Sequence, residues 1–193
     1  EVGTEIERGE RKALRRSVEI TPKQGAELRN ADDEHARGEV IAAAMMNAFL
    51  MLWAKRIETL GKFEDGRYNL DAVVEEGATI AGHLLTMAIR ALDYCPPTDM
   101  DFGQYLAAML TADSEVVPED DRGYRKALRR VFRSYGIVTP ANGCNRDGCW
   151  VRYRNAHRLT YSRSNYAAMT GNPEEMFRFL WENRRSLGID ERA

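Results

Sequence analysis

The chain has 193 residues, of which 44% are hydrophobic and 30% charged, as is typical of a globular domain. Its 28 basic and 30 acidic side chains leave a net charge of −2, so it lacks the strongly basic character of proteins that bind nucleic acid or anionic membranes. Three cysteines are too few for a disulfide-stapled scaffold, and their odd number favours a reducing, cytoplasmic compartment.

Residues 1–33 are polar, and we expect an irregular lead-in with one short helix at "RKALRRSVE". From Glu34 to Leu60 the apolar residues recur at helical spacing, and alanines widen their stripe. The apolar run from Val40 to Trp53 is about 14 residues long, whereas a membrane-spanning helix needs roughly 20. The sequence therefore predicts a buried core helix and no membrane partner.

A second helix is predicted from Asp71 to Leu92, and a Pro-Pro pair follows it. Its apolar stripe consists of Val74, Ala78, Ala81, Leu85, Ala88, Ile89 and Leu92. We expect this stripe to face the core, with Phe49 and Trp53 of the preceding helix packed against Leu85 and Ile89.

Three more helices follow in the sequence. "FGQYLAAMLTAD" is predicted to form one that is capped by Asp99 or Asp101, and "VPEDDRGYRKALRRVFRSYGI" the next, with Pro118 in its first turn. "NPEEMFRFLWENRRSLG" has a cap at Asn172 and a stop at Gly188, and a short hairpin is expected around "GCWVRYR". The predicted fold class is mainly α: a bundle of four to five helices at 1–137, followed by a C-terminal extension at 138–193.

Few residues form a self-contained reactive site. Cys144, Cys149 and His157 offer two thiolates and one imidazole to a zinc ion, but a fourth ligand and the usual close spacing are missing. The favoured interpretation is ordinary thiols on a loop. His83, in the middle of the second helix, is expected to be a core histidine satisfied by a partner.

His35 stands at the start of the most apolar helix, where free backbone N–H groups make the local field positive. Asp32, Asp33 and Glu34 precede it, and a carboxylate can hold an imidazole in one tautomer. Such a histidine is suited to donating a hydrogen bond to a developing oxyanion. On composition alone, the favoured interpretation is a histidine that only contributes to the helix start.

A family resemblance rests on five segments in order: "EVGTEI", "KALRR", "HARGEVIAAAMMNAFLML", "IRALDYCPPTDMDFGQYLAAMLTAD" and "YRKALRRVFRSYGI". Together they resemble the C-terminal helical lobe of thermolysin-like zinc metallopeptidases, the gluzincins, and span Glu1 to Ile137. The resemblance implies that Arg15 hydrogen-bonds a substrate carbonyl and that His35 stabilises the tetrahedral intermediate. Asp33, or its neighbour Asp32, is the candidate to orient His35.

The chain departs from that family in one large respect. It has no H-E-x-x-H, and no two of its three histidines are four residues apart. The resemblance places the zinc ligands upstream, so zinc is expected in a longer parent enzyme and no cofactor in this chain, which is predicted to be inactive alone. The expected partners are the upstream catalytic lobe of the same parent chain and a peptide or protein substrate. Two alternatives stay open: a helical protein-interaction module without catalysis, and a small metal-binding domain built on the C-terminal cysteines.

Overall fold

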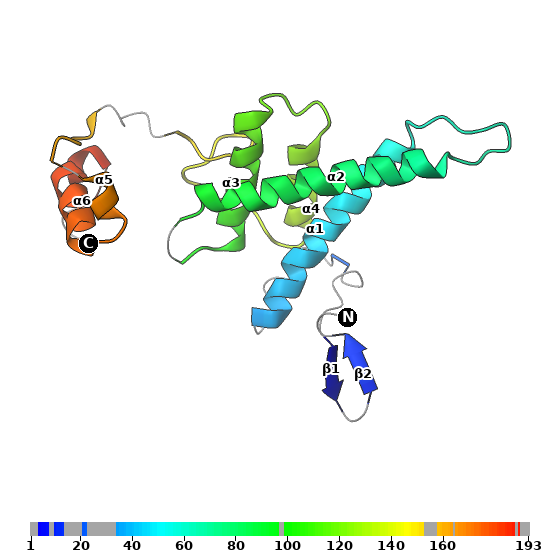
Figure 1. Cartoon of the computed structure of the whole chain (residues 1–193), viewed down its shortest axis with the longest axis horizontal. Coiled ribbons are helices and arrows are strands. Elements are labelled where there is room, and N and C mark those ends of the chain that lie inside the picture. Colours follow the sequence, from blue (N-terminus) through cyan, green and yellow to red (C-terminus); the bar gives the residue numbers. More distant parts are fainter. Residues whose placement is uncertain are drawn as a thin grey trace. The chain divides into compact units, whose positions relative to one another are not determined.

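The computed structural model describes residues 4–7, 10–13, 21–22, 34–96, 99–152, 158–163, 165–187 and 189 (Figure 1). These residues fold mainly into helices, which agrees with the predicted α class. The chain divides into two compact units, Glu1–Trp150 and Val151–Ala193. The first unit holds the helices α1 (Glu34–Ile57), α2 (Leu70–Arg90), α3 (Phe102–Val116) and α4 (Tyr124–Ser134), with a 3-10 turn, η1 (Ala91–Tyr94), after α2.

A two-stranded hairpin precedes these helices, formed by β1 (Thr4–Glu7) and β2 (Glu10–Ala13). The strands pair antiparallel, with Glu5 opposite Lys12. An Arg-Gly pair separates them in the sequence, and glycine is favoured in two-residue hairpin connections. The short helix expected at "RKALRRSVE" is therefore wrong for residues 11–13, and the rest of that segment lies outside the described residues.

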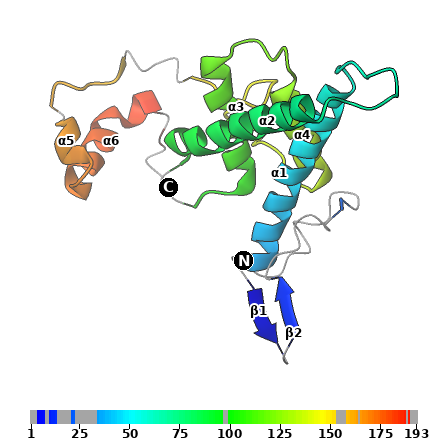
Figure 2. The ribbon, with the colours of Figure 1, turned by 45° about the vertical axis from the view of Figure 1, so that its right-hand side comes forward.

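Helix α1 is the central packing element. Its buried face consists mostly of alanines, which let neighbouring helices come close: Val40, Ala43, Ala44, Ala48 and Leu52. α1 packs against α4 and α2, and α2 crosses it in both views (Figures 1 and 2). Asn47 donates a 2.8 Å hydrogen bond to the hydroxyl of the buried Tyr135, which joins α1 to the end of α4.

Helix α2 packs through a different face from the one predicted. Leu85 and Ile89 are exposed, and the buried residues are Gly77, Ile80, Leu84 and Met87. The indole of Trp53 lies over Gly77 and donates a 2.9 Å hydrogen bond to the Val73 carbonyl. α2 carries two apolar stripes about 100° apart, and the glycine selects the inner one because only there can the Trp53 ring approach the backbone.

Helix α3 is buried along most of its length, with Leu106, Met109 and Leu110 almost inaccessible to solvent. Of the two predicted caps, Asp101 is the one observed. Its carboxylate accepts a 2.7 Å hydrogen bond from the Gln104 amide, and the Gln104 side chain accepts one from the Asp101 amide. This reciprocal capping box explains why the helix begins directly after Asp101.

Helix α4 begins at Tyr124, several residues later than predicted. Gly123 has φ 76°, a left-handed conformation that interrupts any helix coming from Pro118. Asp120 supplies a start signal, because its carboxylate accepts hydrogen bonds from the backbone amides of Arg125 and Lys126. The segment from Pro118 to Gly123 is therefore a loop across the end of α3 and not the first turns of α4.

After α4 the chain continues to pack on the first unit as far as Trp150, whose amide donates a 2.8 Å hydrogen bond to the Thr111 hydroxyl. In the described part of "GCWVRYR", where a short hairpin is expected, Trp150 forms an isolated antiparallel bridge with Cys144. Residues 153–154 lie outside the described residues, so the hairpin itself stays a prediction.

In the second unit, α5 (Tyr166–Met169) precedes α6 (Pro173–Leu187), and Asn172 caps α6 as predicted, accepting a 2.9 Å hydrogen bond from the Glu174 amide.

Two helical runs, Glu34–Ile57 and Leu70–Tyr94, are long and apolar enough to cross a membrane, judged by length and composition alone. The core helix of a soluble protein passes the same test. Each run also buries one face within the first unit. The absence of a membrane partner stays a prediction.

Candidate functional site

The polar centre of the first unit is an imidazole–carboxylate pair between two helices. His83 extends from α2, and its Nε2 lies 2.7 Å from Oδ1 of Asp113 on α3. Asp113 is buried, whereas about a third of the His83 side chain is exposed. A carboxylate in this position fixes the orientation of the ring.

Arg125 of α4 completes this group. Its guanidinium donates to the second carboxylate oxygen of Asp113 and to the carbonyls of Val117 and Pro118, at 2.7 and 2.8 Å. One arginine therefore neutralises the buried acid and satisfies two carbonyls of the loop before α4. The arrangement connects three helices through charge-assisted hydrogen bonds.

A cavity of about 290 Å³ opens beside the pair. The ring of Tyr124 lies against His83, with centroids 4.2 Å apart and planes at 31°. Burial raises the pKa of the Tyr124 hydroxyl above its usual value. The remaining lining residues are mostly acidic and come from the loop before α4: Val117, Glu119, Asp120, Asp121 and Arg122.

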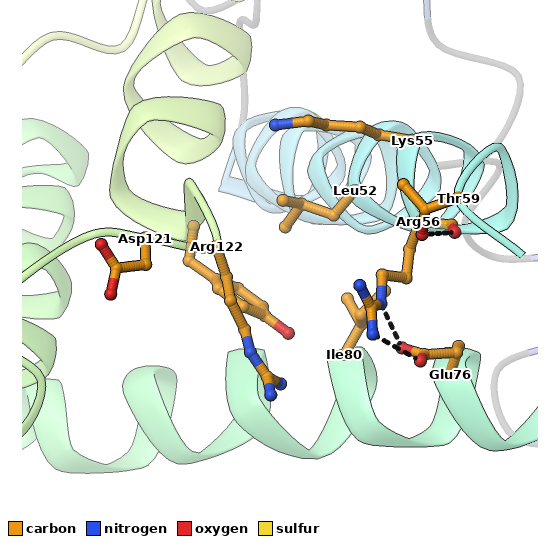
Figure 3. A pocket seen from close by; sticks show the side chains of 9 residues that line it. Leu52, Lys55, Arg56, Thr59, Glu76, Ile80, Asp121 and Arg122 are labelled. Carbon is orange, nitrogen blue, oxygen red and sulfur yellow. Dashed lines mark hydrogen bonds and ion pairs between the residues drawn. The ribbon is translucent and has the colours of Figure 1, made fainter.

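A second cavity, of about 170 Å³, lies between α1 and α2 and shares Asp121, Arg122 and Tyr124 with the first (Figure 3). Arg56 of α1 and Glu76 of α2 form a bidentate ion pair in it, at 2.8 and 2.9 Å. This contact lowers the pKa of Glu76 and raises that of Arg56. Three cations and two carboxylates line this cavity, and the Arg56–Glu76 pair neutralises one of each.

The predicted site residue His35 is the second residue of α1 and is exposed. One turn further on, Val40 is buried, and the Arg37 guanidinium lies 6.0 Å from the centre of the Phe102 ring. The histidine therefore projects from a helix whose next turn is held by the core. The other two predicted site residues, Arg15 and Asp33, lie outside the described residues, as does Asp32.

Cys144 and Cys149 lie in one tight turn after α4, with Cys149 buried and Cys144 half-buried. Burial raises the pKa of both thiols, which disfavours the thiolate that a metal needs. Among the residues that the structure describes, no three His, Cys, Asp or Glu side chains gather as a metal-binding group. His157 lies outside those residues, so its proposed part in a zinc site is untested.

Sequence reasoning anticipated a partner for His83 but missed which residue it is. The signal was available, because Asp113 is the one acid within the apolar segment "YLAAMLTAD" of α3. A lone acid at the buried end of such a helix requires a compensating partner.

No family model, curated protein or solved structure matches this chain. The resemblance to thermolysin-like peptidases therefore rests on the sequence motifs alone.

Proposed function

We propose that this chain is the C-terminal helical lobe of a zinc metallopeptidase that hydrolyses peptide bonds. The observation that carries the proposal is the exposed position of His35 in the first turn of α1, with the core beginning at Val40. A buried helix is a rigid mount, and a preorganised donor on it can stabilise charge that develops in a transition state.

The placement of the family-like segments also supports the proposal. "HARGEV" falls in the first turns of α1, "IRALDY" at the junction of α2 and η1, and "YRKALRRVF" in α4. These segments occupy the helices of one compact unit, as a helical lobe requires.

In the proposed reaction, His35 donates a hydrogen bond to the oxyanion of the tetrahedral intermediate, and Arg15 holds a substrate carbonyl. Asp33 orients the imidazole of His35. A zinc ion, bound by residues of the parent enzyme upstream of this chain, would supply the polarisation of the scissile carbonyl. None of these three residues binds the metal.

The experiment compares two proteins. The 193-residue chain, purified and supplied with zinc, should fold but not cleave a mixed peptide library. The chain extended by the preceding part of its reading frame should contain H-E-x-x-H and cleave peptides until a chelator is added. Absence of that motif upstream, or zinc-dependent cleavage by the short chain, would overturn the proposal.

A second function, a helical module that binds another protein, is favoured by a different observation. Leu85 and Ile89 of α2 are 60% and 59% exposed, and Val74 and Leu92 are exposed on the same side of the helical run. This alternative predicts that the reading frame upstream of the chain contains no H-E-x-x-H. The sequence of that reading frame therefore distinguishes the two functions.

A further inference from the structure

The outer face of α2 and η1 carries an apolar stripe that the described residues of the first unit leave mostly exposed, and only its Ala88 packs partly against the core. Its members, here called the α2 seam, are Val74, Ala78, Ala81, Leu85, Ala88 and Leu92. Val74 is 58% exposed, Leu85 60% and Leu92 65%. Single exposed apolar residues are ordinary, but a continuous row along a whole helix marks an interaction surface.

The spacing of the seam is 4-3-4-3-4, the repeat by which two helices pack side by side. No charged residue interrupts it. The inner face of α2 is already buried through Ile80, Leu84 and Met87, so the seam is additional to what folding of the first unit requires.

The seam is complementary to the seam of a second copy whose helix runs antiparallel to it. Around a centre at residue 83, Val74 lies opposite Leu92 of a second copy, and Ala81 lies opposite Leu85. Ala78 meets Ala88. A large side chain thus faces a small one next to the centre, and two large ones meet at each end. Such self-complementarity is what a two-fold interface requires.

The size of the surface also fits a second copy. With Ile89 and Leu70 at its flank, both exposed, the face presents on the order of 600 Å² of apolar surface. Two such faces together approach roughly 1,200 Å², the smallest total surface that specific protein interfaces usually bury. We infer that the chain forms an antiparallel homodimer in which the α2 seams of two copies pack against each other. This inference goes beyond the proposed function and does not depend on it.

The test uses the pair Val74 and Leu92. Within one chain these residues are 18 positions apart on a helical run, about 27 Å, so oppositely charged substitutions there cannot pair with each other. In the antiparallel dimer they are direct neighbours across the interface. Sedimentation equilibrium of the full chain between about 1 and 100 μM gives the dissociation constant.

We expect the wild-type chain to dimerise in that range. Val74→Glu and Leu92→Lys should each weaken the dimer by more than about tenfold, because each buries an unpaired charge. The double variant V74E/L92K should recover most of the affinity, and so should a mixture of the two single variants. The matched control is Thr79→Glu, which places the same charge on the exposed polar side of α2 and should leave the dimer unchanged.

Circular dichroism should show the same helix content in all variants, since both residues are exposed. A wild-type chain that stays monomeric at 100 μM would overturn the inference, whether or not it binds phosphatidylcholine vesicles through the seam. It would also fail if Thr79→Glu weakened the dimer as much as Val74→Glu, or if the double variant were weaker than both single variants.

Discussion

Asp113 of α3 accepts a hydrogen bond from Arg125 of α4 while both side chains are almost fully buried, at 4% and 9% exposure. His83 of α2 approaches the other oxygen of the same carboxylate. Three helices of the first unit therefore meet at one acid, and the stability of their arrangement depends on it.

Asp113→Ala should cost about 3–5 kcal/mol of unfolding free energy, because it leaves the Arg125 guanidinium buried without its counter-charge. The double variant Asp113→Ala/Arg125→Met should be more stable than Asp113→Ala, since it removes the stranded charge as well. Urea denaturation measures both. Glu76→Gln, which breaks an exposed ion pair, is the control and should change the midpoint little. A loss from Asp113→Ala as small as that of the control would contradict the role given to Asp113.

A pair of glycine substitutions in α2 tests the packing of α1 on it. A Cβ at Gly77 would lie 2.9 Å from the Trp53 ring, so Gly77→Ala should destabilise the chain by about 1–3 kcal/mol despite its better helix propensity. At Gly82 of the same helix nothing lies within 4 Å, and Gly82→Ala should stabilise by about 0.5–1 kcal/mol. Thermal unfolding should therefore show a lower melting temperature for Gly77→Ala and a higher one for Gly82→Ala. If Gly77→Ala also stabilised the chain, Trp53 would not be packed where the structure places it.

The cysteine thiols provide a test by pH. Burial raises the pKa of Cys95, Cys144 and Cys149, so each thiol should react slowly with iodoacetamide at pH 7.5 and faster as the pH rises past the usual thiol range near 8.5. Cys149, which is buried, should be the slowest. The folded state then holds these protons more tightly than the unfolded state, so stability should fall as pH rises above about 8.5 and be unaffected below it. Mass spectrometry of the alkylated chain measures each site, and equal rates in the native and the denatured chain would refute the burial.

The helices were largely readable from the sequence, because periodicity and capping residues act locally. Asp101 and Asn172 mark helix starts because their side chains accept hydrogen bonds from backbone amides two or three residues further along the chain. The structure shows both of these caps. The face of α2 was not readable. Its two apolar stripes are alike in composition, and the choice depends on Trp53 finding Gly77 across another helix. The pairing of His83 with Asp113 likewise depends on tertiary packing over 30 residues of sequence.

The central claim is that His35 acts in catalysis, and the most direct measurement is kcat of His35→Ala in the longer enzyme. The control is Glu34→Ala, which alters the neighbouring exposed residue of the same helix start. Loss of one preorganised oxyanion donor should lower kcat by on the order of 10²–10³, about 3–4 kcal/mol, with KM and zinc content unchanged. Loss of a helix-start interaction alone would cost about 1 kcal/mol of stability and leave kcat near normal. A reduced kcat for His35→Ala beside a normal one for Glu34→Ala is the predicted result, and near-normal kcat with intact zinc in His35→Ala would contradict it.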